Sequence, residues 1–235
     1  MRPAKRIIKK LPGIVLIRGG WPDEARAIIQ TPVFRQLLNG HDVGGSCLNA
    51  GCGEGLFVSF LDSFRGLTRI VHLDLERPLL FRLPDSRHRF ISGSISDLPF
   101  PDKEFDFVFC TEVLEHISDD ARAFHELSRV LRPSGLVLIS TPTPPAPRDP
   151  AHAREGYSLN EIRTAFGAVG LMLLDHRYCM HVTMRLLLNI WRWQYELIGK
   201  QRSWLPRAII LPLGYADWWF PFGKPFDIVA LGRKV

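Results

Sequence analysis

A glycine-rich turn at residues 48–55 constrains the fold of this chain more than any other stretch. It reads Leu-Asn-Ala-Gly-Cys-Gly-Glu-Gly, with glycines at 51, 53 and 55, and it joins an apolar run to residues of helical spacing at 56–64. Glycine permits a left-handed backbone and lets a ligand approach the main chain, and a helix N-terminus offers free N–H groups to an anion. The pattern predicts a ligand-binding strand–turn–helix unit, with an ordinary tight turn as the alternative. Its spacing differs from the GxGxxG of dinucleotide-binding turns.

The composition is that of one globular domain, or of one domain with a substantial embellishment. The chain has 235 residues, 46% of them hydrophobic and 23% charged, which excludes a fibrous or disordered protein. No apolar run approaches the roughly 18 residues of a spanning helix, and the apolar run at 14–17 is short for a signal peptide. The four cysteines lack CxxC spacing, so we expect no disulfide framework, no metal site and a cytoplasmic location.

Short apolar runs alternate with amphipathic stretches from residue 46 onwards, which is typical of strand–helix units around a parallel sheet. The pattern predicts buried strands at 47–50, 70–73, 105–110, 136–140, 171–178 and 226–231. It predicts helices from Asp23 to about residue 38, after Asp119, from a capping box at Ser158 and Glu161, and over 182–200. The proline-rich stretch 142–150 is expected to be a loop.

Polar residues follow three of the predicted strands. Asp74 ends the second, where a carboxylate can accept both hydroxyls of a ribose, although an acid there is often only solvated. The run 105–116 passes from a strand into an acidic turn that includes Glu112 and His116, and 130–142 reads as a helix end, a turn and a strand.

In this order and spacing, four stretches resemble the class I S-adenosylmethionine (SAM)-dependent methyltransferases, specifically the type-11-like group of small-molecule enzymes. They are LNAGCGEG, HLDLE, GSISDLPFPDKEFDFVFCTEVLEHI and LRPSGLVLISTP, and FDIVALGRK resembles the family's last strand. The resemblance implies a Rossmann-like α/β fold with seven mostly parallel strands, the last one antiparallel. We expect a single domain over 1–235, with an N-terminal extension at 1–40 and a helical insertion at 180–225.

The resemblance also implies SAM as cofactor and a set of residues around it. The glycines would wrap the methionine part, Asp74 would hold the ribose, and Leu75 would pack on the adenine. Asn49 and Ser94 stand where the family often has Asp, so both contacts are expected to be weaker. The full expected set is Asn49, Gly51, Cys52, Gly53, Gly55, Asp74, Leu75, Ser94, Ile95, Asp97, Cys110, Thr111 and Glu112.

A phenol or alcohol acceptor also needs a base near the transferred methyl group. The candidates are His116 after the fourth strand, and His152 and Tyr157 in the loop after the fifth. The alternative for each histidine is a structural or solvated role. The predicted reaction is methyl transfer to a small or lipid-like acceptor at oxygen, with carbon or nitrogen methylation, or a SAM-binding protein without turnover, as the other readings.

The segment 180–225 is not explained by this resemblance. Five of the six tryptophans lie between 191 and 219, beside many Leu and Ile residues, and much of the formal net charge of +6 lies here and in the first ten residues. Three readings stay open: a lid packed on the domain, an apolar acceptor pocket, or peripheral contact with a membrane. Nucleic acid is disfavoured, because the aromatic residues are not interleaved with lysines.

Overall fold

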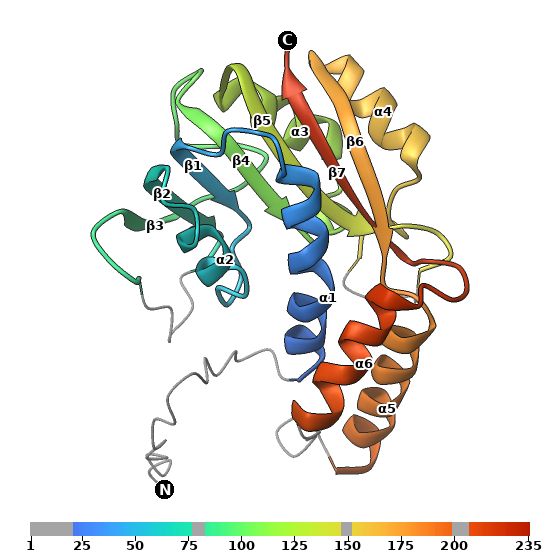
Figure 1. Ribbon diagram of the computed structural model, residues 1–235. Coiled ribbons are helices and arrows are strands. Elements are labelled where there is room, and N and C mark those ends of the chain that lie inside the picture. The colour runs from blue at the N-terminus through green and yellow to red at the C-terminus, as the bar shows by residue number, and fades with distance from the viewer. Residues whose placement is uncertain (1–20, 77–82, 147–151, 199–206) are drawn as a thin grey trace, which may run out of the picture.

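The computed structural model describes residues 21–76, 83–146, 152–198 and 207–235 (Figure 1). Its centre is a seven-stranded sheet in the order β3-β2-β1-β4-β5-β7-β6. β7 runs antiparallel to β5 and β6, and the other pairings are parallel. This confirms the predicted Rossmann-like fold with an antiparallel last strand.

The seven strands include every strand predicted from the sequence and one more. Their bounds are β1 Gly45–Ala50, β2 Leu67–Asp74, β3 His88–Ser92, β4 Phe105–Thr111, β5 Leu131–Pro142, β6 Leu171–Cys179 and β7 Asp227–Lys234. The additional strand is β3, whose half-exposed residues give neither a continuous apolar run nor a clean alternation.

The helices are α1 Trp21–Leu38, α2 Val58–Asp62, α3 Asp120–Val130, α4 Leu159–Ala168, α5 Val182–Ile198 and α6 Arg207–Trp219, with a short 3₁₀ turn at Leu114–His116. The predicted capping box of α4 is present, with Ser158 and Glu161 bonded reciprocally. α2 is shorter than its apolar spacing suggests, because Phe57 and Phe64 belong to the flanking turns. Both still pack, through a ring cluster with Phe34, Phe60 and Phe109.

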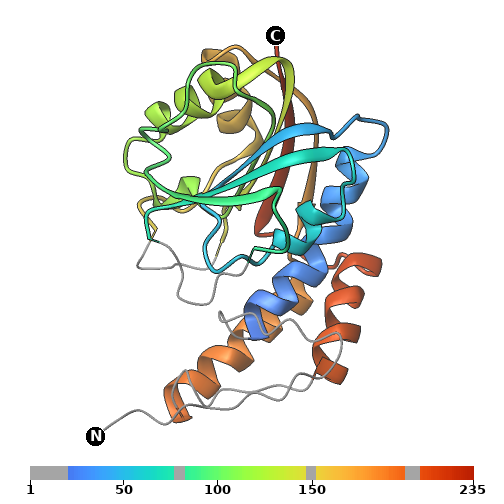
Figure 2. The same ribbon diagram turned by 90° about the vertical axis from the view of Figure 1, so that its left-hand side faces the viewer.

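The sheet has a hydrophobic cluster on each face. α3 and α4 cover one face, where Phe124, Leu127 and Phe166 are buried. α1 covers the other and also contacts α5 and α6, with Met184, Leu187 and Ile210 in the same cluster. α5, α6 and the first turns of α1 extend beyond the sheet edge where β4 and β5 end (Figures 1 and 2). The insertion therefore stands next to the edge at which ligands of such sheets bind.

No helix among the described residues is both long and apolar enough to cross a membrane.

A buried chain of polar side chains ties β1, β2 and β3 together. Asn49 Nδ2 lies 3.0 Å from His72 Nδ1, His72 Nε2 lies 2.9 Å from His88 Nδ1, and His88 Nε2 lies 3.2 Å from Asp62 Oδ1. If each group donates to the next, both imidazoles are neutral and every ring nitrogen is paired. Burial, and then the neighbouring His88, lower the pKa of His72 to about 3.

The low pKa of His72 predicts that the free energy of unfolding decreases as the pH becomes acidic. The folded protein keeps His72 neutral, whereas the unfolded chain takes up a proton below the ordinary histidine pKa of 6.5. Stability from this group is complete above pH 6.5 and is lost as the pH falls toward 3, at up to about 1.4 kcal/mol per pH unit. Urea unfolding measured between about pH 8 and 5 gives the free energy of unfolding at each pH. The slope of this free energy against pH should be smaller for His72→Phe than for the unaltered protein. The exposed His125→Gln is the control, and identical slopes in all three proteins would contradict the assignment.

Candidate active site

The glycine turn is fixed to the ends of β1 and β2 by its own backbone. The N–H groups of Gly51 and Cys52 both donate to the Leu73 carbonyl, at 2.8 and 2.9 Å, and the Gly53 N–H donates to Asp74 Oδ2 at 2.7 Å. Gly51, Gly53 and Gly55 have φ of 71°, 49° and 85°. The left-handed turn predicted from the glycines is therefore present.

Positions 51 and 53 favour glycine for different reasons. A Cβ on Gly51 would lie 2.3 Å from Val113 Cγ2, so this position is closed by packing. A Cβ on Gly53 would meet nothing within 4 Å, and Gly53 borders a cavity. A side chain at Gly53 would therefore extend into space that a ligand can use.

This glycine-loop cavity has a volume of about 260 Å³. The carboxyl-terminal ends of four neighbouring strands, β1, β2, β3 and β4, surround it. The lining residues are Gly51, Gly53, Leu73, Asp74, Leu75, Gly93, Ser94, Ile95, Glu112, Val113, His116 and Ile117.

The cavity offers polar and apolar contacts suited to a nucleoside. Asp74 points both carboxylate oxygens at backbone N–H groups, of Gly53 and of Leu75, and each oxygen retains a lone pair for a further donor. The Leu75 side chain is 71% exposed at the cavity rim, and Ile95 is buried in its wall. An open glycine backbone, a carboxylate and a free apolar face fit the expected SAM.

Seven of the thirteen residues expected around the cofactor line this cavity: Gly51, Gly53, Asp74, Leu75, Ser94, Ile95 and Glu112. The other six do not, and they are Asn49, Cys52, Gly55, Asp97, Cys110 and Thr111. Asn49 is held by His72, and the Asp97 carboxylate points outward, 3.5 Å from Arg122.

The Glu112 turn is the second unusual piece of backbone at this edge. Glu112 has φ of 55°, a left-handed conformation that costs a non-glycine residue energy, and its N–H donates to the Ser140 carbonyl at 2.9 Å. Its carboxylate accepts from Ser140 Oγ at 2.8 Å and from Gln30 Nε2 at 3.1 Å. β4, β5 and α1 thus fix this side chain together.

Three carboxyl groups, Glu112, Glu115 and Asp227, are buried around the guanidinium of Arg26. Arg26 Nη1 lies 3.5 Å from Glu112 Oε2, and Gln30 Nε2 lies 3.2 Å from Asp227 Oδ2. Within the described part of the chain, Asp227 Oδ1 is buried without a hydrogen-bond partner. This cluster therefore contains more acid than base, and one acid with unused bonding capacity.

The three acids have different pKa values. Burial alone would raise the pKa of Glu112, but Arg26 and the hydrogen bonds from Asp227, Ser140 and Gln30 bring it below its usual range. Burial, and then the charge of Glu112, raise the pKa of Asp227 well above its usual range. The same two causes raise the pKa of Glu115 to about 8. Glu112 is therefore the ionised member at neutral pH.

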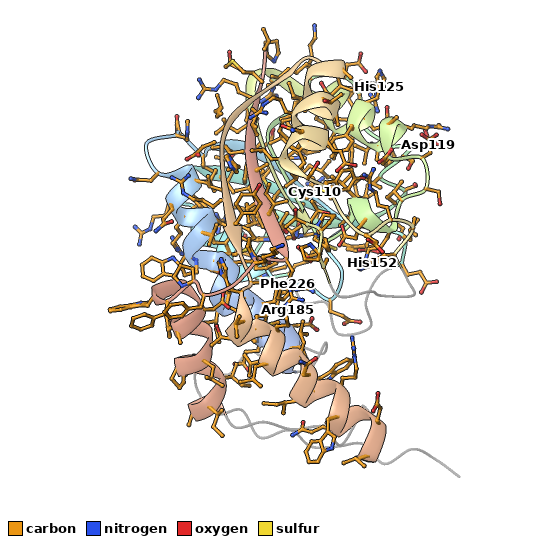
Figure 3. The ribbon with its side chains drawn as sticks, turned by 90° about the vertical axis from the view of Figure 1, so that its right-hand side faces the viewer. Cys110, Asp119, His125, His152, Arg185 and Phe226 are labelled. Atoms are coloured by element: carbon orange, nitrogen blue, oxygen red, sulfur yellow. The ribbon has the colours of Figure 1, made fainter. Side chains whose placement is uncertain are left out.

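A second cavity, of about 140 Å³, lies on the other side of Glu112 and is called here the insertion cavity. α1, α5 and β7 enclose it, and Arg185 on α5 lies over the ring of Phe226 just before β7, 5.0 Å from its centre (Figure 3). Its lining residues are Arg26, Glu112, Pro142, Ala146, His152, Met180, Leu188, Trp191, Arg192, Phe226 and Asp227. Because Glu112 also lines the glycine-loop cavity, the two spaces adjoin.

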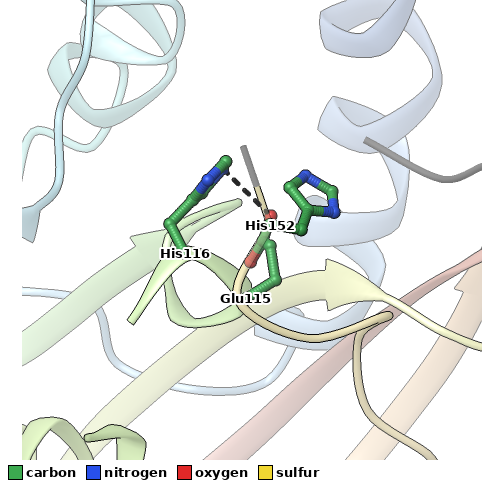
Figure 4. A group of neighbouring side chains, drawn as sticks. All are labelled: Glu115, His116 and His152. Atoms are coloured by element: carbon green, nitrogen blue, oxygen red, sulfur yellow. Dashed lines mark ion pairs between the residues drawn. The ribbon is translucent and has the colours of Figure 1, made fainter. Parts of the chain in front are cut away.

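His116 and His152 meet where the two cavities adjoin (Figure 4). Their ring centres are 4.6 Å apart, edge to face, and His116 Nε2 lies 3.9 Å from Glu115 Oε1. The Glu115 carbonyl accepts from the N–H groups of Ala153 and Arg154, at 2.8 and 3.2 Å, which fastens the His152 loop to the turn after β4.

Tyr157 lies elsewhere. Its hydroxyl donates to Asp120 Oδ2 at 2.8 Å, and Arg154 stacks on its ring. Burial, and then the bond to Asp120, raise its pKa, which does not suit a base. It lines a larger cavity of about 430 Å³ between α3 and α4 that contains no residue of the glycine turn. The structure thus brings His116 and His152 together and leaves Tyr157 apart.

Sequence reasoning missed Arg26, Gln30, Glu115 and Asp227. Arg26 and Gln30 are four residues apart on α1, so they share a face of that helix. Nothing in the sequence states that this face meets the ends of β4, β5 and β7. Glu115 was visible only as part of an acidic turn.

Comparison with known proteins gives a consistent result. Residues 48–139 match the family model described as a methyltransferase domain. The chain is 31% identical over 172 residues to a probable S-adenosylmethionine-dependent methyltransferase of Mycolicibacterium smegmatis, covering 62% of this chain and 65% of that protein. It is 37% identical over 122 residues to a malonyl-[acyl-carrier protein] O-methyltransferase of Serratia marcescens, covering 50% and 47%. The chain thus spans between about half and two thirds of these relatives.

Solved structures share the fold. A S-adenosylmethionine dependent methyltransferase from Mesorhizobium loti has a TM-score of 0.59 at 19% identity, over 86% of this chain and 96% of that one. Phosphoethanolamine N-methyltransferase 2 of Haemonchus contortus, solved with S-adenosyl-L-methionine, has a TM-score of 0.57 at 17% identity, over 87% and 52%. At these identities the likeness concerns the fold alone.

Two glycines give a matched test of the glycine-loop cavity. Gly53 and Gly40 both have positive φ, and a Cβ on either meets nothing within 4 Å, but only Gly53 borders the cavity. Gly53→Ala and Gly40→Ala should each lose about 1–2 kcal/mol of stability from backbone strain. In calorimetric titration with S-adenosylhomocysteine (SAH), Gly53→Ala should bind at least about tenfold more weakly, and Gly40→Ala should bind normally. Equal affinities in the two variants would place the ligand elsewhere.

Proposed function

Since the chain carries the methyltransferase domain of the class I SAM-dependent family, we propose that it transfers a methyl group from SAM to oxygen of a small or lipid-like acceptor. The observation that supports this most is the pair of adjoining cavities. One has the glycine turn, Asp74 and Leu75, and the other has an apolar wall from the insertion, with Glu112 between them.

The division of labour follows from this arrangement. SAM supplies an activated methyl group, whose carbon–sulfur bond breaks as the acceptor oxygen bonds to carbon, with the electron pair staying on sulfur and SAH left behind. The protein has to align the two reactants and exclude water. We propose that Gly51, Gly53 and Asp74 hold the cofactor in the glycine-loop cavity, and that the insertion cavity takes the acceptor.

The acceptor hydroxyl would lie at the junction, beside His116 and His152. Both side chains can accept the proton that the hydroxyl loses. The apolar wall, from Met180, Leu188 and Trp191, suits an apolar portion of the acceptor. The curated relative from Serratia marcescens is named a malonyl-[acyl-carrier protein] O-methyltransferase, which agrees with an oxygen acceptor.

The activity can be tested with SAM labelled in its methyl group. Incubation with fractionated cell extract should transfer label to the lipid fraction, and the ¹³C shift of the transferred methyl group separates oxygen from nitrogen or carbon attachment. Asp74→Ala should lose both SAH binding and labelling. Label on nitrogen or carbon would refute the oxygen assignment. SAH binding without label in any fraction would favour a binding protein without turnover.

The insertion has an outward apolar face that its packing does not use. On α5, α6 and the turn after α6, exposed apolar side chains gather: Leu186, Trp193, Leu197, Ile209, Tyr215, Trp218, Trp219, Phe220 and Phe222. We propose that this exposed insertion face contacts an anionic membrane surface. Tryptophan and tyrosine favour the lipid headgroup region, and Arg192 and Lys224 are exposed on the same insertion.

The three readings of the insertion therefore concern different residues. Met184, Leu187 and Ile210 are buried and belong to the domain core, which fits the packed lid. Leu188 and Trp191 line the insertion cavity, which fits the acceptor pocket. Trp193, Trp218 and Trp219 remain exposed and support the membrane contact. Trp204 lies outside the described residues.

Vesicle sedimentation tests the membrane contact. The protein should sediment with phosphatidylglycerol vesicles at low salt and be released as salt screens the charges. A Trp218→Ser/Trp219→Ser variant should bind at least about tenfold more weakly, because two large apolar side chains no longer leave water. Met172→Ser, which removes an exposed apolar side chain on β6, is the control. Failure of the unaltered protein to sediment would remove this part of the proposal.

A further inference from the structure

We infer that Glu115, His116 and His152 form a binding site for a divalent metal ion at the junction of the two cavities. One donor atom from each residue lies within 4.8 Å of the other two. The spacing of the cysteines gave no sign of such a site. The three side chains come together because the loop after β5 returns to the turn after β4 (Figure 4).

The ligand set is chemically suited to a divalent ion. Two imidazoles and one carboxylate bind zinc and the divalent first-row transition metals at about 2.0–2.2 Å. Donors at that distance from one ion lie about 3.0–3.5 Å apart, so the present group closes on an ion through small side-chain rotations. The His116 side chain is 39% exposed, so part of it borders solvent and not packed neighbours.

The surroundings support each ligand. Thr141 Oγ1 donates to Glu115 Oε2 at 3.3 Å, so Oε1 is the oxygen that faces His116. The His152 loop is held by two N–H groups that donate to the Glu115 carbonyl. Metal sites depend on such outer contacts to orient their ligands.

The position also gives the ion a use in the proposed reaction. His116 lines the glycine-loop cavity and His152 lines the insertion cavity, so an ion between them touches both spaces. Three protein ligands leave coordination positions open to an acceptor oxygen. A bound cation lowers the pKa of a hydroxyl group next to it. With the ion present, the two imidazoles serve as its ligands instead of as bases.

A second group of potential ligands, Asp62, Asp85 and His88, is the natural comparison among the described residues. Arg87 pairs with both aspartates there, at 3.0 Å to Asp85, and so already supplies a positive charge. We assign no metal to this group.

Manganese binding tests the inference without any acceptor. Titration of the full chain with Mn²⁺, followed by electron paramagnetic resonance and by calorimetry with Mn²⁺ and Zn²⁺, should show one ion per chain. His116→Gln and His152→Gln should each weaken binding at least about tenfold. His125→Gln and Asp85→Asn should bind as the unaltered protein does.

SAH calorimetry on the same samples separates this inference from the proposed function. Unaltered SAH affinity in His152→Gln together with weakened Mn²⁺ binding supports the site. The inference is overturned if the unaltered protein binds neither Mn²⁺ nor Zn²⁺. It is also overturned if both histidine variants bind the ion as strongly as the unaltered protein does. Both outcomes count whether or not SAH binds. Weakened binding only in Asp85→Asn would place the ion at the other group and overturn it as well.

Discussion

The contacts between the glycine turn and the end of β2 are the constraint on which the site depends. The N–H groups of Gly51 and Cys52 share the Leu73 carbonyl, and the Gly53 N–H meets the Asp74 carboxylate. These contacts require a left-handed backbone, and at Gly51 the Val113 side chain leaves no space for a Cβ. The turn therefore holds β1, β2 and the segment after β4 in one fixed arrangement, and the glycine-loop cavity is the space that this arrangement leaves.

A second constraint acts at the Glu112 turn, where polar groups from distant parts of the chain are buried together. Gln30 from α1 reaches acids after β4 and at the start of β7, and Ser140 of β5 donates to Glu112. This network joins the insertion side of the molecule to the strand ends. It also concentrates acid where the two cavities adjoin, so that shape and charge act at the same place.

Prediction from sequence was most successful where short-range rules act. The apolar runs predicted all the strands except β3, whose residues are half exposed, and Ser158 and Glu161 predicted a helix start that the structure contains. Among the residues expected around the cofactor, Gly51, Gly53, Asp74 and Leu75 line the glycine-loop cavity. Arg26, Gln30 and Asp227 escaped prediction, because each reaches the site only through the packing of α1 and β7 on the sheet.

The sequence by itself determined the strand–helix units of a parallel sheet and the glycine turn, since alternating apolar runs and glycine at left-handed positions act over a few residues. Only the tertiary structure decided that His152 meets His116 and Glu115, because backbone bonds to the Glu115 carbonyl bring a loop back to a turn far away in the chain. It also decided which residues of the insertion are core, cavity wall or exposed face. Those roles depend on how α5 and α6 pack against α1, and local spacing does not contain that information.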